Sequence, residues 1–246
     1  MLAKIRYQLS VKDGDISQAM ASLFHGALIE LLPLEYASYL HLSQLNPFSQ
    51  HLERQEGNWY WEISTFTQEA YRIIIQESLT GIHEIYLKHK DMTVRLEEIS
   101  RIVVPKRQLL DIFHGGNKSR TVELEFLTPT AFKQRGEYLF FPDIFCIYQS
   151  LLNKYSAASD NVEVMDEETL EQLCRDTKII GYRLRSAPFY LEGVRVPGFL
   201  GKVTLKIKGA QTMVNFAHAL FEFGWYSGIG IKCSLGMGAI TVDRRE

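Results

Sequence analysis

The sequence predicts an α+β fold made of two tandem ferredoxin-like (RRM-like) domains, each with the element order βαββαβ. Three observations predict it. Each half of the chain opens with alternating polar and apolar residues, helical patterns follow, and a glycine-containing linker at residues 114–118 separates the halves. Alternation is typical of strands, and apolar residues three to four positions apart are typical of helices. We therefore expect one domain over residues 1–115 and a second over residues 116–246.

Residues 2–10 open the first half with a strand pattern, because Ile5, Tyr7 and Leu9 alternate with polar residues. We expect Asp15 to cap a helix that extends to about residue 32, and Pro33 to open a second, short helix over 33–43. The other elements expected in this half are strands at 48–54 and 58–65, a helix near 67–79, and extended segments near 82–89 and 92–104.

The second half repeats this element order, although no sequence identity marks a repeat. Its expected elements are a strand at 121–127, helices near 143–156 and 166–176, a strand pair at 178–192 and 196–208, a helix at 210–223 and a strand at 239–244.

Length and composition are those of an ordinary globular protein. The chain has 246 residues, of which 46% are hydrophobic and 23% charged, enough for a substantial core. No apolar run approaches the roughly 20 residues of a membrane span, and the N-terminus lacks a secretory pattern. Cys146, Cys174 and Cys233 are odd in number and widely spaced, so we expect no disulfide framework. We predict a cytoplasmic protein without cofactor, metal or membrane association.

The net charge of −2 argues against a protein coated in basic residues, but the charge is unevenly distributed. Residues 160–176 hold seven acids and one base, whereas residues 178–209 hold seven bases and one acid. Strand alternation predicts that Lys202, Lys206 and Lys208 share one face of their strand. It also predicts that two arginines share one face of the strand before it. Together they predict either a surface for RNA phosphates or an ordinary solvated face. The two arginines are Arg183 and Arg185.

The segment GIGIKCSLGMG, residues 228–238, contains two G-x-G pairs around Lys232. Glycine lets the backbone adopt positive φ and approach a ligand closely, so main-chain N–H groups here are expected to face phosphate. A helix precedes this segment and a strand follows it, the reverse of a P-loop or dinucleotide-binding motif. A connection whose glycines serve only tight packing is the alternative. The four glycines concerned are Gly228, Gly230, Gly236 and Gly238.

Four segments together resemble the CRISPR repeat-processing endoribonucleases, a branch of the RAMP superfamily. The terminal GIGIKCSLGMG resembles their glycine-rich loop, and LTPTAF at 127–132, followed by FPD at 141–143, resembles the opening of their second domain. FHGAL at 24–28 lies in their first helix. YLH at 39–41, followed by NPFS at 46–49, resembles the segment that carries their usual catalytic histidine.

The resemblance implies a metal-independent ribonuclease in which the ribose 2′-OH attacks the adjacent phosphate of CRISPR repeat RNA. It assigns the catalytic role to His41, as general acid or base, with His25 of the preceding helix as its partner. Many members carry a lysine shortly after this histidine, and residues 42–50 contain none. The cationic role then falls to Lys232 or to protonated His25.

The resemblance also implies partners. The RNA is bound as a single strand or a hairpin, by a monomer or homodimer, and the guide RNA passes to an effector complex. The alternatives are a non-catalytic RAMP-type subunit that binds RNA in such a complex, and a generic single-strand RNA-binding module with exposed stacking aromatics. The pair of histidines on adjacent helices favours the enzyme, because a pure binding protein does not need it.

Overall fold

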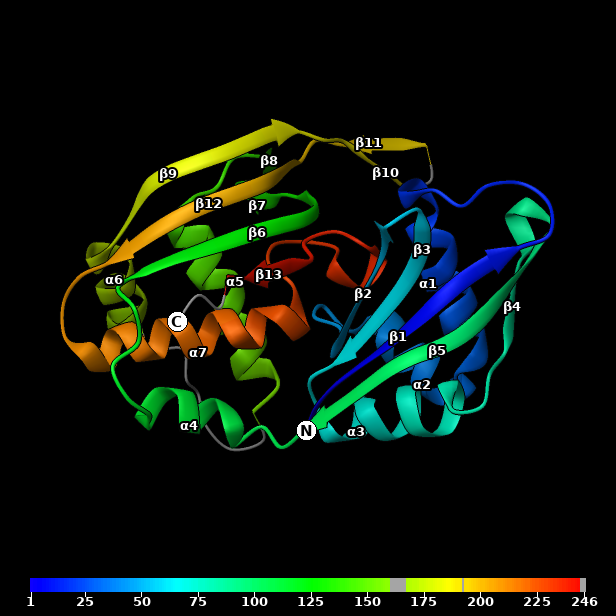
Figure 1. Ribbon diagram of the computed structural model, residues 1–246, viewed down its shortest axis with the longest axis horizontal. Helices are drawn as coiled ribbons and strands as arrows, with labels where there is room; N and C mark the ends of the chain where they lie inside the picture. The colour runs from blue at the N-terminus through cyan, green and yellow to red at the C-terminus, as the bar shows by residue number, and fades with distance from the viewer. Residues whose placement is uncertain (160–166, 192, 244–246) are drawn as a thin grey trace.

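The computed structural model describes residues 1–159, 167–191 and 193–243, and contains a five-stranded and a four-stranded antiparallel sheet side by side (Figure 1). Each sheet belongs to one half of the chain, which confirms the predicted tandem ferredoxin-like architecture. The short helix α4 (Gln108–His114) and residues 115–120 connect the halves, and the boundary predicted near residue 115 lies in this connection. No helix of the described residues is both long and apolar enough to span a membrane.

The first sheet has the strand order β2-β3-β1-β5-β4, with every neighbouring pair antiparallel. Ile5, Tyr7 and Leu9 of β1 are buried, as the alternation predicts. The strands are β1 (Leu2–Val11), β2 (Phe48–Gln55), β3 (Asn58–Thr65), β4 (Glu84–Leu87) and β5 (Met92–Val104). The helical elements of this half are η1 (Gln18–Met20), α1 (Ala21–Leu31), α2 (Leu34–Leu42), α3 (Gln68–Ala70), η2 (Tyr71–Leu79) and η3 (Lys88–Lys90).

The second sheet has the strand order β13-β6-β12-β9, again antiparallel throughout. The predicted pair of strands after residue 177 is confirmed as β9 and β12, with the hairpin β10–β11 between them. The strands are β6 (Thr121–Thr130), β7 (Phe132–Gln134), β8 (Glu137–Leu139), β9 (Thr177–Ser186), β10 (Phe189–Leu191), β11 (Val194–Val196), β12 (Phe199–Ile207) and β13 (Ile240–Val242). The helices are α5 (Ile144–Ala157), α6 (Glu167–Asp176), α7 (Gln211–Ser227) and the one-turn η4 (Cys233–Leu235).

Each half has its own apolar core, and the second half also contributes to the first core. Phe189 and Val196 of the hairpin β10–β11, and Met237 after η4, pack with the buried residues of the first half. Figure 1 shows this hairpin extending from the second sheet toward α1. Burial of such side chains is worth about 1.5–3 kcal/mol each, so these contacts hold the two halves together.

Two sequence expectations require correction, and a third element is present with a different hydrogen-bonding pattern. Asp15 caps no helix: it is exposed, and α1 begins only at Ala21, after the turn η1. Lys208 lies just beyond β12, which ends at Ile207. The helix expected near 67–79 is present, but its main part, η2, has wider, π-type hydrogen bonding. The first part of the acidic segment, residues 160–166, lies outside the described residues.

Candidate active site

The glycine-rich loop fills the junction between the two halves of the chain. A Cβ on Gly236 would lie 2.4 Å from the Cβ of Ala21 in α1, and Gly236 has a φ of +114°. A Cβ on Gly238 would lie 2.1 Å from the carbonyl oxygen of Ile229, across the loop. Glycine is therefore required at both positions, because a Cβ would overlap the Ala21 methyl group in one case and the loop backbone in the other. The packing explanation left open by the sequence holds for these two glycines.

Most amide groups of the loop are used inside the protein. Ile229 N donates to Gly238 O at 2.8 Å, Ile231 N donates to Ala131 O at 3.0 Å, and Gly238 N donates to Pro129 O at 3.1 Å. The amides of residues 228 and 230 donate to a carbonyl of α7 and a hydroxyl of α5. The expectation that the whole loop directs its N–H groups toward phosphate can therefore apply to only part of the loop. Within the described part of the chain, the loop amides without a protein partner include those of residues 232–234.

A buried lysine, which is not predicted from the sequence, fixes the base of this loop. The Lys154 ammonium, on α5, donates to Gly228 O at 2.9 Å, to Ser227 O at 3.3 Å and to Cys233 Sγ at 3.0 Å. Its charge lies at the C-terminal end of α7, where the helix dipole favours a cation. Lys154 follows Leu151 by three residues on the buried side of α5, so its helical position is the sequence signal for its burial.

His25 lies on α1, directly against the loop. Its Nδ1 is 2.9 Å from the carbonyl oxygen of Ser234 in η4, and its ring stacks on Phe48 with centroids 5.9 Å apart. A carbonyl oxygen only accepts, so Nδ1 carries the proton and Nε2 of the neutral ring is an acceptor. Burial lowers the pKa of His25, the hydrogen bond from Nδ1 opposes this, and the charge of His41 lowers the pKa further. Near neutral pH the ring is thus held in the form that accepts a proton.

His41 lies in the last turn of α2 and is exposed to solvent. His41 is on the helix that follows α1, and its charge contributes to lowering the pKa of His25. The chain then turns back into β2, where Asn46 Nδ2 donates to Ser234 Oγ at 3.1 Å. Gln50 Nε2 donates to Ser234 O at 3.1 Å. Ser234 therefore receives contacts from α1, the segment before β2, and β2 itself.

Lys232 precedes η4 and has a left-handed backbone conformation, with φ of +56°. Its carbonyl oxygen accepts from Leu235 N at 2.9 Å and from Met237 N at 3.3 Å. Its side chain is partly exposed and, among the described residues, its ammonium has no ion-pair or hydrogen-bond partner. Lys232 therefore presents an uncompensated positive charge two residues from the carbonyl that binds His25.

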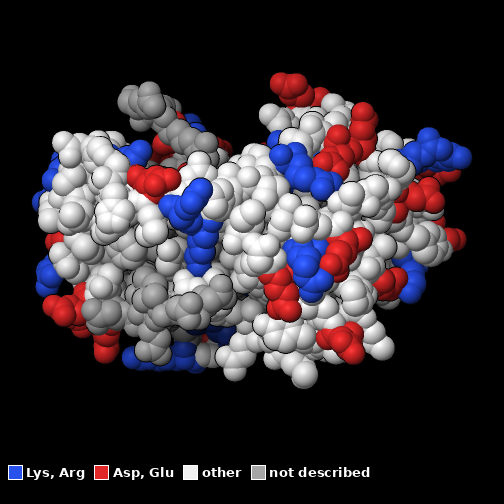
Figure 2. Space-filling model, turned by 90° about the horizontal axis from the view of Figure 1, so that it is seen from below, with Lys and Arg blue, Asp and Glu red and all other residues white. Residues whose placement is uncertain are grey.

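The basic strand surface is less basic than the sequence suggests. Lys202 lies between two glutamates of β6, 2.9 Å from Glu123 and 3.4 Å from Glu125. Alternation in β6 places both glutamates on one face, but the sequence does not say which strand pairs with which. On another face, seen from below in Figure 2, acidic and basic side chains are also interspersed, and the described residues form no continuous basic stripe there.

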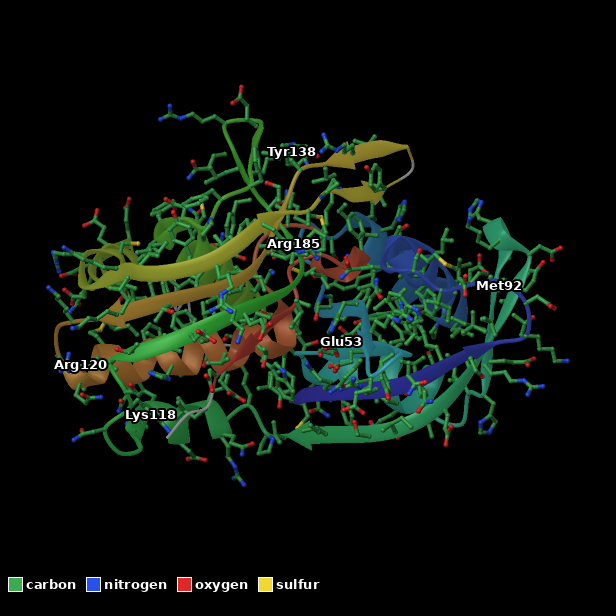
Figure 3. All side chains as sticks on the ribbon, turned by 45° about the horizontal axis from the view of Figure 1, so that its top comes forward. Glu53, Met92, Lys118, Arg120, Tyr138 and Arg185 are labelled. Carbon is green, nitrogen blue, oxygen red and sulfur yellow. The ribbon has the colours of Figure 1, made fainter. Side chains whose placement is uncertain are left out.

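Four basic side chains of the strand surface are exposed: Lys206, Lys208, Arg183 and Arg185. Arg183 lies opposite Lys202 in the antiparallel register, so the two share one face of the sheet. Arg185 lies close to the middle of the molecule, near the end of β9 where the chain continues into the hairpin β10–β11 (Figure 3). Positive charge thus extends along β9 toward the junction.

One group of described side chains has the spacing of metal ligands. His51 and Glu53 of β2 and Glu62 of β3 place one ligand atom each within 4.8 Å of one another. Both carboxylates already have cationic partners, because Lys4 lies 3.1 Å from Glu62 and Arg6 lies 3.3 Å from Glu53. The charges of this cluster balance without an added cation. We therefore do not propose this cluster as a metal site.

Comparison with known proteins identifies the family. The family model described as CRISPR-associated endoribonuclease Cas6 matches residues 124–240. A Cas6 endoribonuclease of Streptococcus thermophilus is 35% identical over 231 residues, covering 94% of each chain. One of Mycobacterium tuberculosis is 38% identical over 224 residues, covering 89% of this chain and 70% of that protein.

Solved structures agree on the fold. A Cas6 product complex superimposes with a TM-score of 0.82 at 24% identity, covering 98% of this chain and 99% of that one. Cas6 of Thermus thermophilus superimposes with a TM-score of 0.72 at 22% identity, covering 98% of both. The extent and identity of the sequence matches show that this chain belongs to the Cas6 family of CRISPR-associated endoribonucleases.

Proposed function

We propose that this protein cuts CRISPR repeat RNA in a precursor transcript without a metal ion, with His25 as general base and His41 as general acid. The single observation that carries the assignment is the hydrogen bond of His25 Nδ1 to Ser234 O, which leaves Nε2 free to accept a proton. His41, which is exposed in the last turn of α2, supplies the proton to the leaving group in this proposal. His25, which the family resemblance implies only as a partner of His41, takes the role of base in this proposal.

In the proposed reaction, His25 Nε2 removes the proton of the ribose 2′-OH, whose oxygen forms a bond to the adjacent phosphorus. The bond from phosphorus to the 5′-oxygen of the next nucleotide breaks, and His41 protonates that oxygen. The products are a 2′,3′-cyclic phosphate and a 5′-hydroxyl. The Lys232 ammonium and the amides of residues 232–234 stabilise the negative charge on the phosphoryl oxygens.

The RNA backbone is held by the exposed cations of β9 and β12 together with the glycine-rich loop. In this arrangement residues 1–115 supply the acid and base, and residues 116–246 supply the surface that binds RNA. The released guide RNA passes to an effector complex in the cytoplasm. We propose that the protein acts as a monomer or homodimer.

The test is the pH dependence of cleavage by wild type, His25→Ala and His41→Ala on a repeat RNA. Each variant is expected to lose about 10²- to 10⁴-fold in rate, while the RNA dissociation constant stays near wild type. His25→Ala should lose the fall in rate at low pH, because the base no longer titrates. A 2′-deoxy residue at the cut should block the reaction, whereas a chelator should not. Full activity of His41→Ala, or cleavage that requires added metal, contradicts the proposal.

A further inference from the structure

A cavity of about 410 Å³ lies beside His25, where the two halves of the chain meet. Three parts of the chain form it: α1, the segment from β4 into η3, and residues of the second half that reach across the junction. Those last residues are Leu191 of β10 and Leu235 of η4. The volume lies within the roughly 300–1,000 Å³ typical of small-ligand sites and offers room for one nucleotide.

The walls of this cavity suit a flat, apolar ring. Leu23, Leu191 and Leu235 line it, and Gly26 contributes a stretch of α1 without a side chain. A Cβ built on Gly26 would meet no atom within 4 Å, so the helix backbone there forms an open floor. Bases splayed out of an RNA strand are commonly bound between such surfaces.

One carboxylate and one ammonium line the cavity, in contact with each other. The Glu30 carboxylate of α1 lies 2.9 Å from the Lys88 ammonium of η3, and the two side chains are 51% and 65% exposed. A solvent-exposed ion pair of this kind contributes little net stability. A ligand can therefore bind to both the carboxylate and the ammonium with little loss of free energy from the pair.

A carboxylate beside an ammonium matches the Watson–Crick edge of guanine. The guanine N1–H and N2–H groups donate side by side to a carboxylate, while O6 accepts from an ammonium. Adenine and cytosine each present a ring nitrogen acceptor where guanine presents N1–H, which a carboxylate repels. Uracil presents one donor between two acceptors and forms a single such bond.

We propose that this cavity binds the guanine base of the nucleotide whose 2′-OH attacks, with Glu30 and Lys88 reading its edge. The nucleotide on the 5′ side of the cut is indicated because His25, the proposed base for that 2′-OH, lines the cavity. The inference rests on the proposed function and adds a base preference to it.

The test compares cleavage of four repeat RNAs that differ only in the base 5′ of the mapped cut, together with an inosine version. Wild type is expected to cut the guanine RNA about tenfold or more faster, in kcat/KM, than the adenine RNA, since one bidentate contact gives about 1–3 kcal/mol of discrimination. Inosine lacks the N2 amine and should fall between them. Glu30→Gln should reduce the preference to below about threefold, because it weakens the contact with guanine and removes the repulsion that the carboxylate exerts on the ring nitrogen of adenine.

Glu35→Gln is the matched control, because Glu35 is an exposed glutamate of the neighbouring helix α2 and does not line the cavity. It should keep the full preference for guanine. Equal cleavage of all four RNAs by wild type, or an unchanged preference in Glu30→Gln, overturns the inference and leaves the proposed function standing. If wild type cuts none of the RNAs, the proposed function itself fails.

Discussion

The junction at the glycine-rich loop and the basic surface on β9 and β12 are built on opposite principles. At the junction, Gly236 lies so close to the methyl group of Ala21 that there is no room for a Cβ. On the basic surface, Arg183 and Lys206 are exposed, and one of its lysines is neutralised by glutamates. The junction therefore depends on shape, and the surface depends on charge.

This difference determines how each region tolerates change. Interiors are close-packed, so an added methyl group at the junction displaces its neighbours. Exposed charges act through a screened field, so removing one of them weakens binding by a modest and salt-dependent amount. Substitutions at the junction should therefore have large effects on both stability and cleavage, whereas substitutions on the surface should change RNA affinity alone.

The largest effect is expected from Gly236→Ala. The new Cβ would lie 2.4 Å from Ala21 Cβ at a φ of +114°, so both overpacking and backbone strain oppose it. Each of these costs about 1–3 kcal/mol. We expect the free energy of unfolding, measured by urea denaturation, to fall by about 2–6 kcal/mol. Cleavage should fall with it, because His25 would no longer have its fixed carbonyl partner.

Gly26→Ala is the matched control for stability, because Gly26 lies in α1 with no atom within 4 Å of a built Cβ. Alanine in a helix interior is favoured over glycine by about 1 kcal/mol, so this variant should be slightly more stable than wild type. Equal stability losses in the two variants would contradict the steric account of the junction.

A smaller effect is expected from acid, through His51 of β2. Burial lowers the pKa of His51 to about 4, and its Nε2 has no hydrogen-bond partner among the described residues. The unfolded chain, with a histidine pKa of about 6.5, binds this proton first as the pH falls. The free energy of unfolding should therefore decline between about pH 6.5 and 4, by up to about 3 kcal/mol.

His51→Gln removes this titration and should flatten the decline, as measured by urea denaturation at several pH values across that range. His114→Gln is the control, because His114 is exposed at the end of α4 and its replacement should leave the decline unchanged. An equally steep decline in His51→Gln and wild type would show that other groups cause the acid sensitivity.

The sequence predicts well those elements whose pattern is local, and predicts poorly the contacts between distant parts of the chain. Periodicity identifies β1, α5, α7 and the pair β9 and β12, because the alternation of buried and exposed positions is a local property. The predicted start of α1 is too early, because Asp15 resembles a helix cap. The burial of Met20 and Ala21 instead decides where the helix packs. Glycine spacing marks the loop, but the reason for Gly236 is Ala21, which lies more than two hundred residues earlier in the chain.

Within the candidate site, the sequence indicates residue types but not their partners. The family resemblance selects His25 and His41, but the carbonyl of Ser234 that defines the His25 tautomer carries no sequence signal, since every residue has a carbonyl. Strand position alone assigns Lys202 to the basic surface. Its neutralisation by two glutamates depends on the pairing of β12 with β6, which is a property of the sheet.

The smallest effects are expected on the basic surface, where they distinguish the exposed cations from a lysine that glutamates neutralise. Arg183→Ala and Lys206→Ala each remove an exposed positive charge, and each should weaken repeat-RNA binding by a few-fold at moderate salt. The slope of log K against log salt should fall by about one for each phosphate that is no longer neutralised. Lys202→Ala should change the slope less, because Glu123 and Glu125 already compensate its charge.

Cleavage of saturating RNA should stay near wild type in all three surface variants, since none of the replaced side chains lies at the junction. A loss of cleavage at saturation would mean that the surface also positions the scissile phosphate, and the separation of shape from charge would then fail. If Lys202→Ala weakens binding as much as Arg183→Ala does, RNA must displace the glutamates from Lys202. The charge of this surface would in that case be set by the ligand rather than by the sheet.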